Sequence, residues 1–443
     1  MMDWNLLLSA KRFGQENRKI QSVADARSQF QRDYDRLVFS APFRRLQNKT
    51  QVFPLPGSVF VHNRLTHSLE VASVGRSLAH GIAARLRKTD LLEDKELLNE
   101  LASIVGAACL AHDMGNPPFG HAGEDAISRY FKSSQGNWLR EYLSAEQWLD
   151  LTHFEGNANA LRLLTNQFRG RREGGYVLTY STLASLIKYP YSSRATSFGS
   201  KKYGYFQSEA DTFRRIVGEL GLEKVATEPD SYARHPLVYL VEAADDICYE
   251  IMDIEDAHKL KILETGVTRE LLLAFFESAD EGFKTKTDRV FQEVTDTNEQ
   301  IAYLRAAVIG KLIGECVEIF WQHHDEILSG TFQNGLVDYL QGSSRKAFDH
   351  CKKVAVKQIY QHPSVVKIEL TGYSVMGKLL DVFSHAVLNP EDGYSRKLLS
   401  LVPQQYQVQV EGVYFRLMAI VDFISGMTDL YALDLYKDIQ GIR

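Results

Sequence analysis

Apolar residues recur every three or four positions through most of this chain. In "THSLEVASVGRSLAHGIAARL", Val74, Leu78 and Ile82 fall near the spacing of one helix face, and "LLNELASIVGAACLAHD" repeats the pattern before it stops at a Gly-Pro-Pro loop. Alternating runs typical of β-strands are scarce. The pattern therefore predicts an all-α fold, two of whose helices carry His67 and His112.

Three stretches depart from this periodicity. The segment "VFPLPGSVFVH" at 52–62 predicts a short β-hairpin, and "YPYSSRATSFGSKKYGYFQ" at 189–207 predicts a long loop lying on the helical body. The charged stretch at 281–300 is compatible with an amphipathic helix or with a boundary. Because neither repeats nor low-complexity tracts appear, we treat residues 1–443 as a single helical unit.

Composition and charge are those of an ordinary globular protein. The 443 residues are 44% hydrophobic, and 51 basic against 56 acidic residues give a net charge of -5. This balance excludes a generally polycationic nucleic-acid binder, although local basic patches remain compatible with it. No segment, the N-terminal "MMDWNLLLSAKRF" included, approaches the roughly 18 apolar residues of a membrane span, so we expect a cytoplasmic protein without a membrane partner.

The cysteines are isolated in the sequence, without CxxC spacing. They are Cys109, Cys248, Cys316 and Cys351. This usage predicts small buried thiols in a reducing compartment, and neither disulfides nor a zinc-thiolate site.

Potential metal ligands come from three predicted helices. His67 lies in "RLTHS", the pair His112-Asp113 ends the next apolar helix, and "VEAADDICYEIMD" supplies Asp245 and Asp246. Two imidazoles with carboxylates form a mixed nitrogen and oxygen site that suits Mn, Fe, Ni, Zn or Mg and can keep coordination positions open. Taken singly, each residue has an ordinary structural explanation, such as a histidine capping a helix C-terminus. Their conjunction favours a metal site.

Helical phase distinguishes the two neighbouring aspartates. Asp245 shares its face with Val241, so it is expected to point inward, where a metal would compensate the buried carboxylate. Asp246 shares its face with Glu242 and Glu250, and we expect that acidic face to be solvated. The phase therefore predicts Asp245 as the fourth ligand.

The turn "GHAGE" holds a candidate acid and base. His121 and Glu124 are three residues apart and therefore project from one face of the helix that begins there. This spacing suits general acid/base catalysis, but it also suits a glutamate favoured by the helix dipole beside a surface histidine. Arg64 precedes His67 by one helical turn, so an anion bound to the metal would lie within its reach.

The order of His67, His112-Asp113 and a distant aspartate resembles the HD superfamily of metal-dependent phosphohydrolases. Within it, six segments between about residues 40 and 432 resemble the dGTPase-type deoxynucleoside triphosphate triphosphohydrolases. The segments are "FRRLQNKTQVFPL", "NRLTHSLEV", "HDMGNPPFGHAGE", "HFEGNA", "EAADDICYEIMDIED" and "ISGMTDLYA".

The resemblance implies a fold and a reaction. The fold is an HD-domain helical fold, with a catalytic core at 58–256 and additional C-terminal helices at 257–443. The reaction is hydrolysis of a deoxynucleoside triphosphate, with dGTP preferred, at the α-phosphorus to give the deoxynucleoside and inorganic tripolyphosphate. It implies one divalent cation, Mg or Mn first and Fe, Ni, Zn or Co as alternatives. It also implies a homo-oligomer, such as a hexamer, and a single-stranded DNA effector.

The resemblance also assigns roles to residues. The metal ligands are His67, His112, Asp113 and Asp245, and the catalytic pair is His121 and Glu124. The triphosphate-binding residues are Arg64, Asn157, Lys188, Tyr189 and Lys202, with Arg194 and Lys201 as further loop cations. For the sugar, Tyr249 packs on the deoxyribose, where a 2'-hydroxyl would clash, while Asp253 and Gln51 bind the 3'-hydroxyl. Glu369 matches a position near the base.

Other reaction classes have less support in the sequence. It contains no phosphate-binding P-loop, no dinucleotide fingerprint after a strand and no G-x-S-x-G elbow. Two alternatives stay open: an HD-type nucleotide phosphodiesterase or phosphohydrolase of other specificity, and a non-catalytic nucleotide or single-stranded DNA binding protein.

Overall fold

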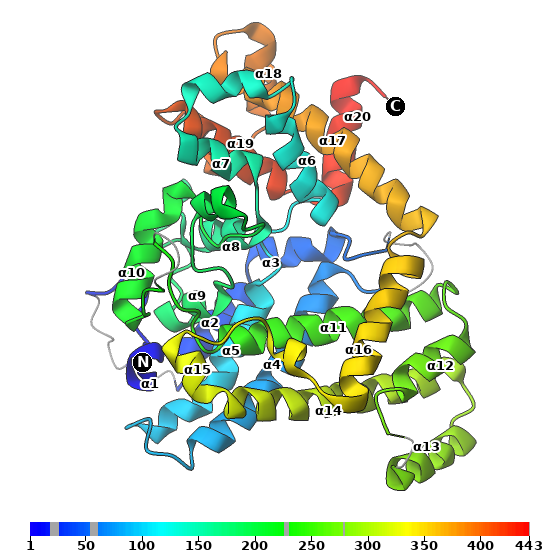
Figure 1. Ribbon diagram of the computed structural model, residues 1–443. Helices are drawn as coiled ribbons and strands as arrows, with labels where there is room; N and C mark the ends of the chain where they lie inside the picture. Colours follow the sequence, from blue (N-terminus) through cyan, green and yellow to red (C-terminus); the bar gives the residue numbers. More distant parts are fainter. Residues whose placement is uncertain (18–25, 54–60, 226–229, 278–279, 443) are drawn as a thin grey trace.

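The chain folds into packed helices. The computed structural model describes residues 1–17, 26–53, 61–225, 230–277 and 280–442. Within these ranges the only strand-like pairings are isolated β-bridges, so the predicted all-α class is confirmed (Figure 1). Most of the expected hairpin at 52–62 lies outside the described residues, although Thr50 and Asn63 on either side of it form one antiparallel bridge. No described helix is long and apolar enough to cross a membrane.

The larger body is built around three helices that pack on one another: α4 (Arg64–Leu86), α5 (Leu101–Ala111) and α11 (Val238–Lys259). Further helices of this body are α1 (Trp4–Leu7), α2 (Gln29–Val38), α3 (Ala41–Arg45), α8 (Gly156–Thr165), α9 (Tyr180–Leu186), α10 (Ala210–Leu220), α12 (Thr265–Leu273), α13 (Glu281–Glu293), α14 (Thr297–Gln322), α15 (His324–Ser329) and α16 (Gly342–Val354). The stretch at 281–300, for which helix and boundary were both open, contains α13, a non-helical break at 294–296 and the first turn of α14.

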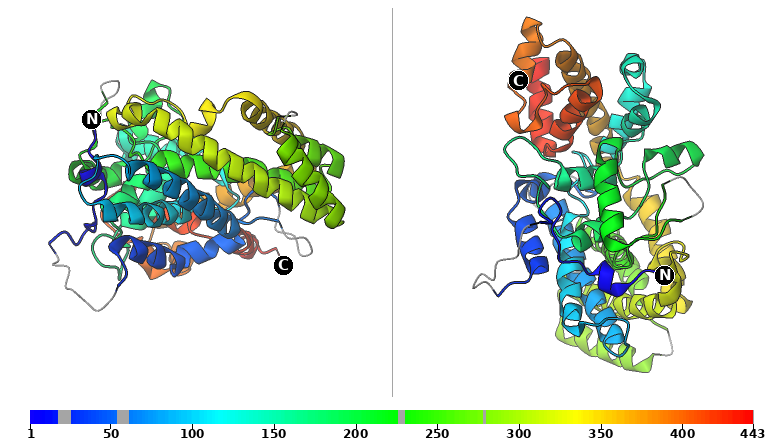
Figure 2. Two further views of the ribbon diagram at one scale, coloured as in Figure 1. Left: turned by 90° about the horizontal axis from the view of Figure 1, so that it is seen from below. Right: turned by 90° about the vertical axis from the view of Figure 1, so that its left-hand side faces the viewer.

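A smaller bundle lies on one end of this body, at the top of Figure 1 and in the right-hand view of Figure 2. It comprises α6 (His121–Lys132), α7 (Ala145–Thr152), α17 (Pro363–Leu388), α18 (Gly393–Ser400), α19 (Val413–Ser425) and α20 (Asp429–Gln440). The buried apolar side chains of these helices form their own cluster. In this cluster α6 and α7, which precede residue 256, pack with helices that follow residue 257, so the cluster does not mark a boundary there. The expected boundary between residues 256 and 257 stays a prediction.

Local sequence explains why the central helices place polar groups where they do. The side chain of Asn63 accepts a hydrogen bond from the backbone of Thr66 and so begins α4 directly at Arg64. Almost every residue of α5 is buried, as expected for a helix that is apolar on all sides. Its C-terminal end, and with it His112, therefore lies inside the protein.

The loop at 189–207 lies on the helical body as predicted. Short 3-10 turns shape it at Ser193–Phe198 and begin again at Gln207. Tyr203 and Phe206 are fully buried, and the Tyr203 hydroxyl donates to the carbonyl of Asp150. These anchors fix the backbone beside Lys202.

A buried ion cluster joins the two bodies, and we predict that it is needed for stability. Arg162 of α8 donates to both carboxylate oxygens of Asp422 in α19, each at 2.8 Å, and to Glu209 at 2.7 Å. Arg162→Met would leave two buried carboxylates without a counter-ion, and should lower the free energy of unfolding by about 3–5 kcal/mol. Denaturant titration of this variant and of Arg214→Met, whose ion pair is exposed, measures the difference. Equal, small losses would contradict the prediction.

Candidate functional site

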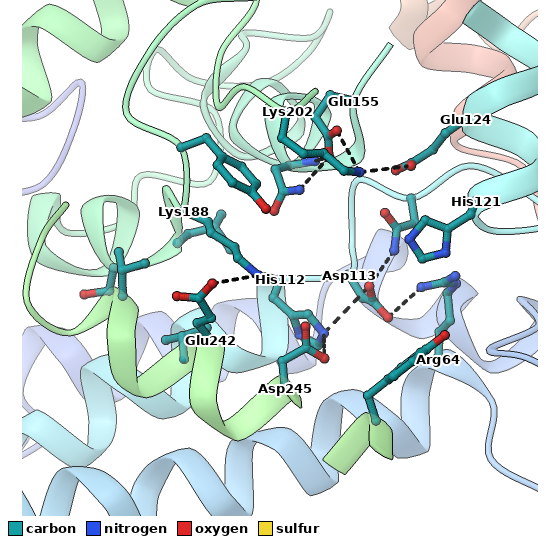
Figure 3. A pocket seen from close by; sticks show the side chains of 18 of the residues that line it. Arg64, His112, Asp113, His121, Glu124, Glu155, Lys188, Lys202, Glu242 and Asp245 are labelled. Carbon is teal, nitrogen blue, oxygen red and sulfur yellow. Dashed lines mark hydrogen bonds and ion pairs between the residues drawn. The ribbon is translucent and has the colours of Figure 1, made fainter. Parts of the chain in front are cut away.

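One pocket collects most of the predicted site residues from helices distant in the sequence (Figure 3). Its walls come from the first turn of α4, the C-terminal end of α5, the first turn of α6 and the middle of α11, together with the loop at 189–207. The predicted residues that line it are Gln51, Arg64, His112, Asp113, His121, Glu124, Asn157, Lys188, Tyr189, Lys202, Asp245 and Tyr249.

The predicted metal ligands converge at the floor of this pocket. Ligand atoms of His67, His112 and Asp113 lie within 4.8 Å of one another. Asp245 Oδ1 lies 3.0 Å from His67 Nε2 and 3.5 Å from His112 Nε2. The packing of α4, α5 and α11 is what brings these four side chains together.

The donor set fits a divalent cation. His112 Nδ1 donates to the carbonyl of Cys109 at 2.6 Å, and this bond fixes the tautomer in which Nε2 is free to ligate. That Nε2 is buried and has no hydrogen-bond partner among the described residues. Burial opposes a charge on the ring, but the carboxylates of Asp113 and Asp245 outweigh it and raise the pKa of His112 to about 9. A cation would supply the positive charge that these carboxylates favour.

Asp113 is also held from outside the cluster. Arg64 Nη1 donates to its Oδ2 at 2.7 Å, and the amide of Asn116 donates to its Oδ1. Burial would raise the pKa of Asp113, but the charges of Arg64, His112 and His67 together lower it. Such partners keep a ligating carboxylate ionised and oriented.

The candidate acid and base face the pocket from the first turn of α6. The backbone N–H of Gly156 donates to Glu124 Oε1 at 2.9 Å, and Lys202 Nζ lies 3.8 Å from Oε2. Burial raises the pKa of Glu124 despite Lys202, whereas desolvation and the charges of Arg64 and Lys202 lower the pKa of His121. The two shifts bring the pKa of the carboxyl and the pKa of the imidazole closer together, which suits proton transfer by this pair.

Gly156 has a steric reason to be glycine. A Cβ there would lie 2.4 Å from Glu124 Oε1 and 2.2 Å from Asn116 Oδ1. The absence of a side chain at Gly156 therefore lets the first turn of α8 lie close to Glu124, so that the Gly156 N–H donates to the carboxylate of Glu124.

The two lysines of the pocket are paired with buried carboxylates. Lys188 Nζ lies 3.0 Å from Glu242, which also pairs with Arg234 at 2.9 Å, and Lys202 Nζ lies 2.9 Å from Glu155. Burial opposes the charge of Lys188, but Glu242 together with the neighbouring Asp246 and Asp245 raises the pKa of Lys188 overall. The sequence reasoning missed Glu155 and Glu242. Glu155 lies in "HFEGNA" and Glu242 in "EAADDICYEIMDIED", but only the tertiary structure shows that they pair with Lys202 and Lys188.

The four predicted sugar and base contacts have different surroundings, and two of them line the pocket. Tyr249 and Gln51 line the pocket, and Gln51 Oε1 is buried without a hydrogen-bond partner among the described residues. Asp253 is buried one helical turn beyond Tyr249 and accepts a hydrogen bond from Tyr360 at 2.8 Å. Glu369 is exposed on α17 and does not line the pocket, because α17 turns Val365 and Gly372 inward instead.

Two other expectations need correction. Arg194 and Lys201 are exposed and lie outside the lining of the pocket. The acidic face of α11 is not solvated, since Glu242 and Glu250 are only 9% and 5% exposed. Arg234 and Lys188 neutralise Glu242, and α16 packs on α11. Asp246 is half-buried, and burial, opposed by the Lys188 charge, raises its pKa to about 7.

Comparison with known proteins agrees with this geometry. Residues 64–178 match the model of the HD domain, and residues 339–438 match that of the phosphohydrolase-associated domain. A deoxyguanosinetriphosphate triphosphohydrolase-like protein of Synechocystis sp. is 37% identical over the whole of both chains, and one of Pseudomonas aeruginosa is 37% identical over 99% of each. The deoxyguanosinetriphosphate triphosphohydrolase of Yersinia enterocolitica is 31% identical over 93% of this chain and 94% of its own. This chain therefore belongs to the deoxyguanosinetriphosphate triphosphohydrolase family of HD-domain proteins.

Proposed function

We propose that this protein hydrolyses deoxynucleoside triphosphates, dGTP foremost, to the deoxynucleoside and inorganic tripolyphosphate. The observation that carries the proposal is the shared pocket. It is lined by residues of the His and Asp cluster, by the pair His121 and Glu124, and by three cationic side chains. Phosphoryl transfer to water requires an electrophile, groups that transfer protons, and positive charges that balance the polyanion.

The substrate's triphosphate would be bound by Arg64, Lys188 and Lys202. The lysines are held by Glu242 and Glu155 in this structure, so phosphate oxygens would replace or join those carboxylates as acceptors. Asn157 and Tyr189 line the same wall and offer an amide and a hydroxyl.

Proton transfer falls to the residues of α6. A divalent cation held by His67, His112, Asp113 and Asp245 would polarise an oxygen of the α-phosphate. Glu124 orients and deprotonates the water that attacks the α-phosphorus, and His121 assists in delivering a proton to the departing 5'-oxygen as the bond from phosphorus to that oxygen breaks. Deoxynucleoside and tripolyphosphate then form in one step.

The sugar would lie against α11. Tyr249 lines the pocket, and its ring packed on the deoxyribose would clash with a ribose 2'-hydroxyl, while the unpartnered oxygen of Gln51 would accept from the 3'-hydroxyl. Asp253, one turn beyond Tyr249, lies outside the lining of the pocket and accepts from Tyr360, so it would have to exchange that partner to act as the second acceptor.

A product assay tests this proposal directly. The metal-loaded protein is incubated with each deoxynucleoside triphosphate and with GTP, and tripolyphosphate, pyrophosphate and phosphate are separated. We expect tripolyphosphate from dGTP in one step, and much weaker hydrolysis of GTP because of Tyr249. Stepwise release of phosphate or pyrophosphate would indicate another HD-type phosphohydrolase, and binding without turnover would indicate a nucleotide-binding protein.

A further inference from the structure

The turn that delivers His121 and Glu124 to the pocket has an unusual backbone. Phe119 has φ 63° and Gly120 has φ 60°, so a non-glycine residue adopts a left-handed conformation two residues before His121, the first residue of α6. This conformation costs a non-glycine residue on the order of 1 kcal/mol and persists only where surrounding contacts hold it. Gly120 has no side chain to cap α6.

A carboxylate from the far end of the chain holds this turn. Asp429, the first residue of α20, is 7% exposed. Its Oδ1 accepts from the backbone N–H of Phe119 at 3.0 Å, and its Oδ2 accepts from the backbone N–H of Thr50 at 2.9 Å. One side chain thus ties the turn before the candidate acid and base to the residue that precedes Gln51.

Two further contacts fasten the same loop to the C-terminal helices. Lys49 is buried, and its ammonium donates to the carbonyl of Asn116 at 2.6 Å and to that of Ser425 at 2.8 Å. On the opposite side, a Cβ at Gly372 of α17 would lie 2.8 Å from Cβ of Phe119, so α17 packs closely on the turn. The loop is therefore enclosed by α17, α19 and α20.

We infer that Asp429 is a positioning residue, which holds the 119–120 turn so that His121 and Glu124 face the metal cluster. The inference rests on the proposed function, because it is the proposed acid and base that the turn carries. Asp429 lies in the segment "ISGMTDLYA", and a carboxylate at a helix N-terminus is already favoured by the helix dipole. Holding the 119–120 turn is a second role, separate from that one. It also explains how the phosphohydrolase-associated region serves a site built on the HD domain.

Asp429→Asn tests this role, because both carboxylate oxygens of Asp429 accept from backbone N–H groups, those of Phe119 and Thr50. The amide keeps the shape of the side chain, but its NH2 group must face either Phe119 or Thr50, where no acceptor is present. We expect kcat to fall about 10- to 10²-fold, because displacing catalytic groups by about 1 Å costs that much. Metal per subunit should stay at the wild-type value, since the four ligands lie on other elements. Asp434→Asn, at an exposed position of the same helix, is the matched control.

The readouts are kcat, KM, metal content and hydrogen exchange of the backbone amides at 119–124. Faster exchange with reduced kcat in Asp429→Asn, but not in Asp434→Asn, supports the positioning role. Gly372→Ala should give the same two effects by pushing Phe119 from the other side. Unchanged exchange in Asp429→Asn, or faster exchange with unchanged kcat, would overturn the positioning role of Asp429. Wild-type protein that hydrolyses no deoxynucleoside triphosphate would refute the proposed function, and exchange at 119–124 alone would then decide whether Asp429 holds the turn.

Discussion

Asp245→Asn should abolish metal binding and turnover together while the protein stays folded. The carboxylate of Asp245 lies 3.0 Å from His67 Nε2 and 3.5 Å from His112 Nε2, and the neutral amide of Asn is a much poorer ligand. Since the proposed electrophile is lost with the metal, we expect turnover to fall by about 10²-fold or more. Elemental analysis of the purified variant gives metal per subunit.

Asp246→Asn is the matched control, because it removes the same charge from the adjacent residue of α11. Asp246 is half-buried with a pKa of about 7, raised by burial, so near neutral pH its carboxyl is already partly protonated and Asn resembles that form. Metal stoichiometry should therefore stay largely intact. Metal loss in the Asp246 variant alone would show that the phase assignment on α11 is wrong.

Removing the candidate base should separate chemistry from binding. Glu124→Gln keeps an oxygen that can accept from Gly156, but it removes the ability to take a proton from water. His121→Ala removes the proposed proton donor. Both should lower kcat by roughly 10²-fold or more, with metal content and binding of a deoxynucleoside triphosphate retained. Single-turnover kinetics and equilibrium binding of dGTP measure the two properties.

Asp125→Asn provides the comparison for these variants. Asp125 neighbours Glu124 on α6 but is exposed and lies outside the pocket lining, so its loss should leave kcat near that of the wild type. Near-normal turnover in Glu124→Gln and His121→Ala would mean that the first turn of α6 has only a structural role.

Local sequence was enough to predict the helices and to place several candidate site residues on shared helix faces, whereas most of the other site roles came from the family resemblance. The apolar run of α5 predicts a buried helix, and a polar pair at its C-terminal end is then necessarily close to the interior. Spacings of three residues, as in His121 and Glu124, place side chains on one helix face whatever the rest of the fold does. The phase of Asp245 on α11 follows from the same regularity, and the structure places its carboxylate against both imidazoles.

Contacts between distant segments could not be obtained in this way. Helical phase predicted a solvated face for Glu242 and Glu250, but phase says nothing about Arg234 or α16, which bury that face. In the same way, Glu369 proved to be exposed, because the side of α17 that meets the body is chosen by packing.

The sequence by itself thus determined which side chains share a helix face, because the α-helix repeats with a fixed geometry over a few residues. Only the tertiary structure decided which faces meet. It brought Glu155 to Lys202 and Asp429 to the backbone of Phe119, pairs separated by tens to hundreds of residues. Such pairings depend on how whole helices pack and on which buried charges can be compensated, and no local pattern encodes either.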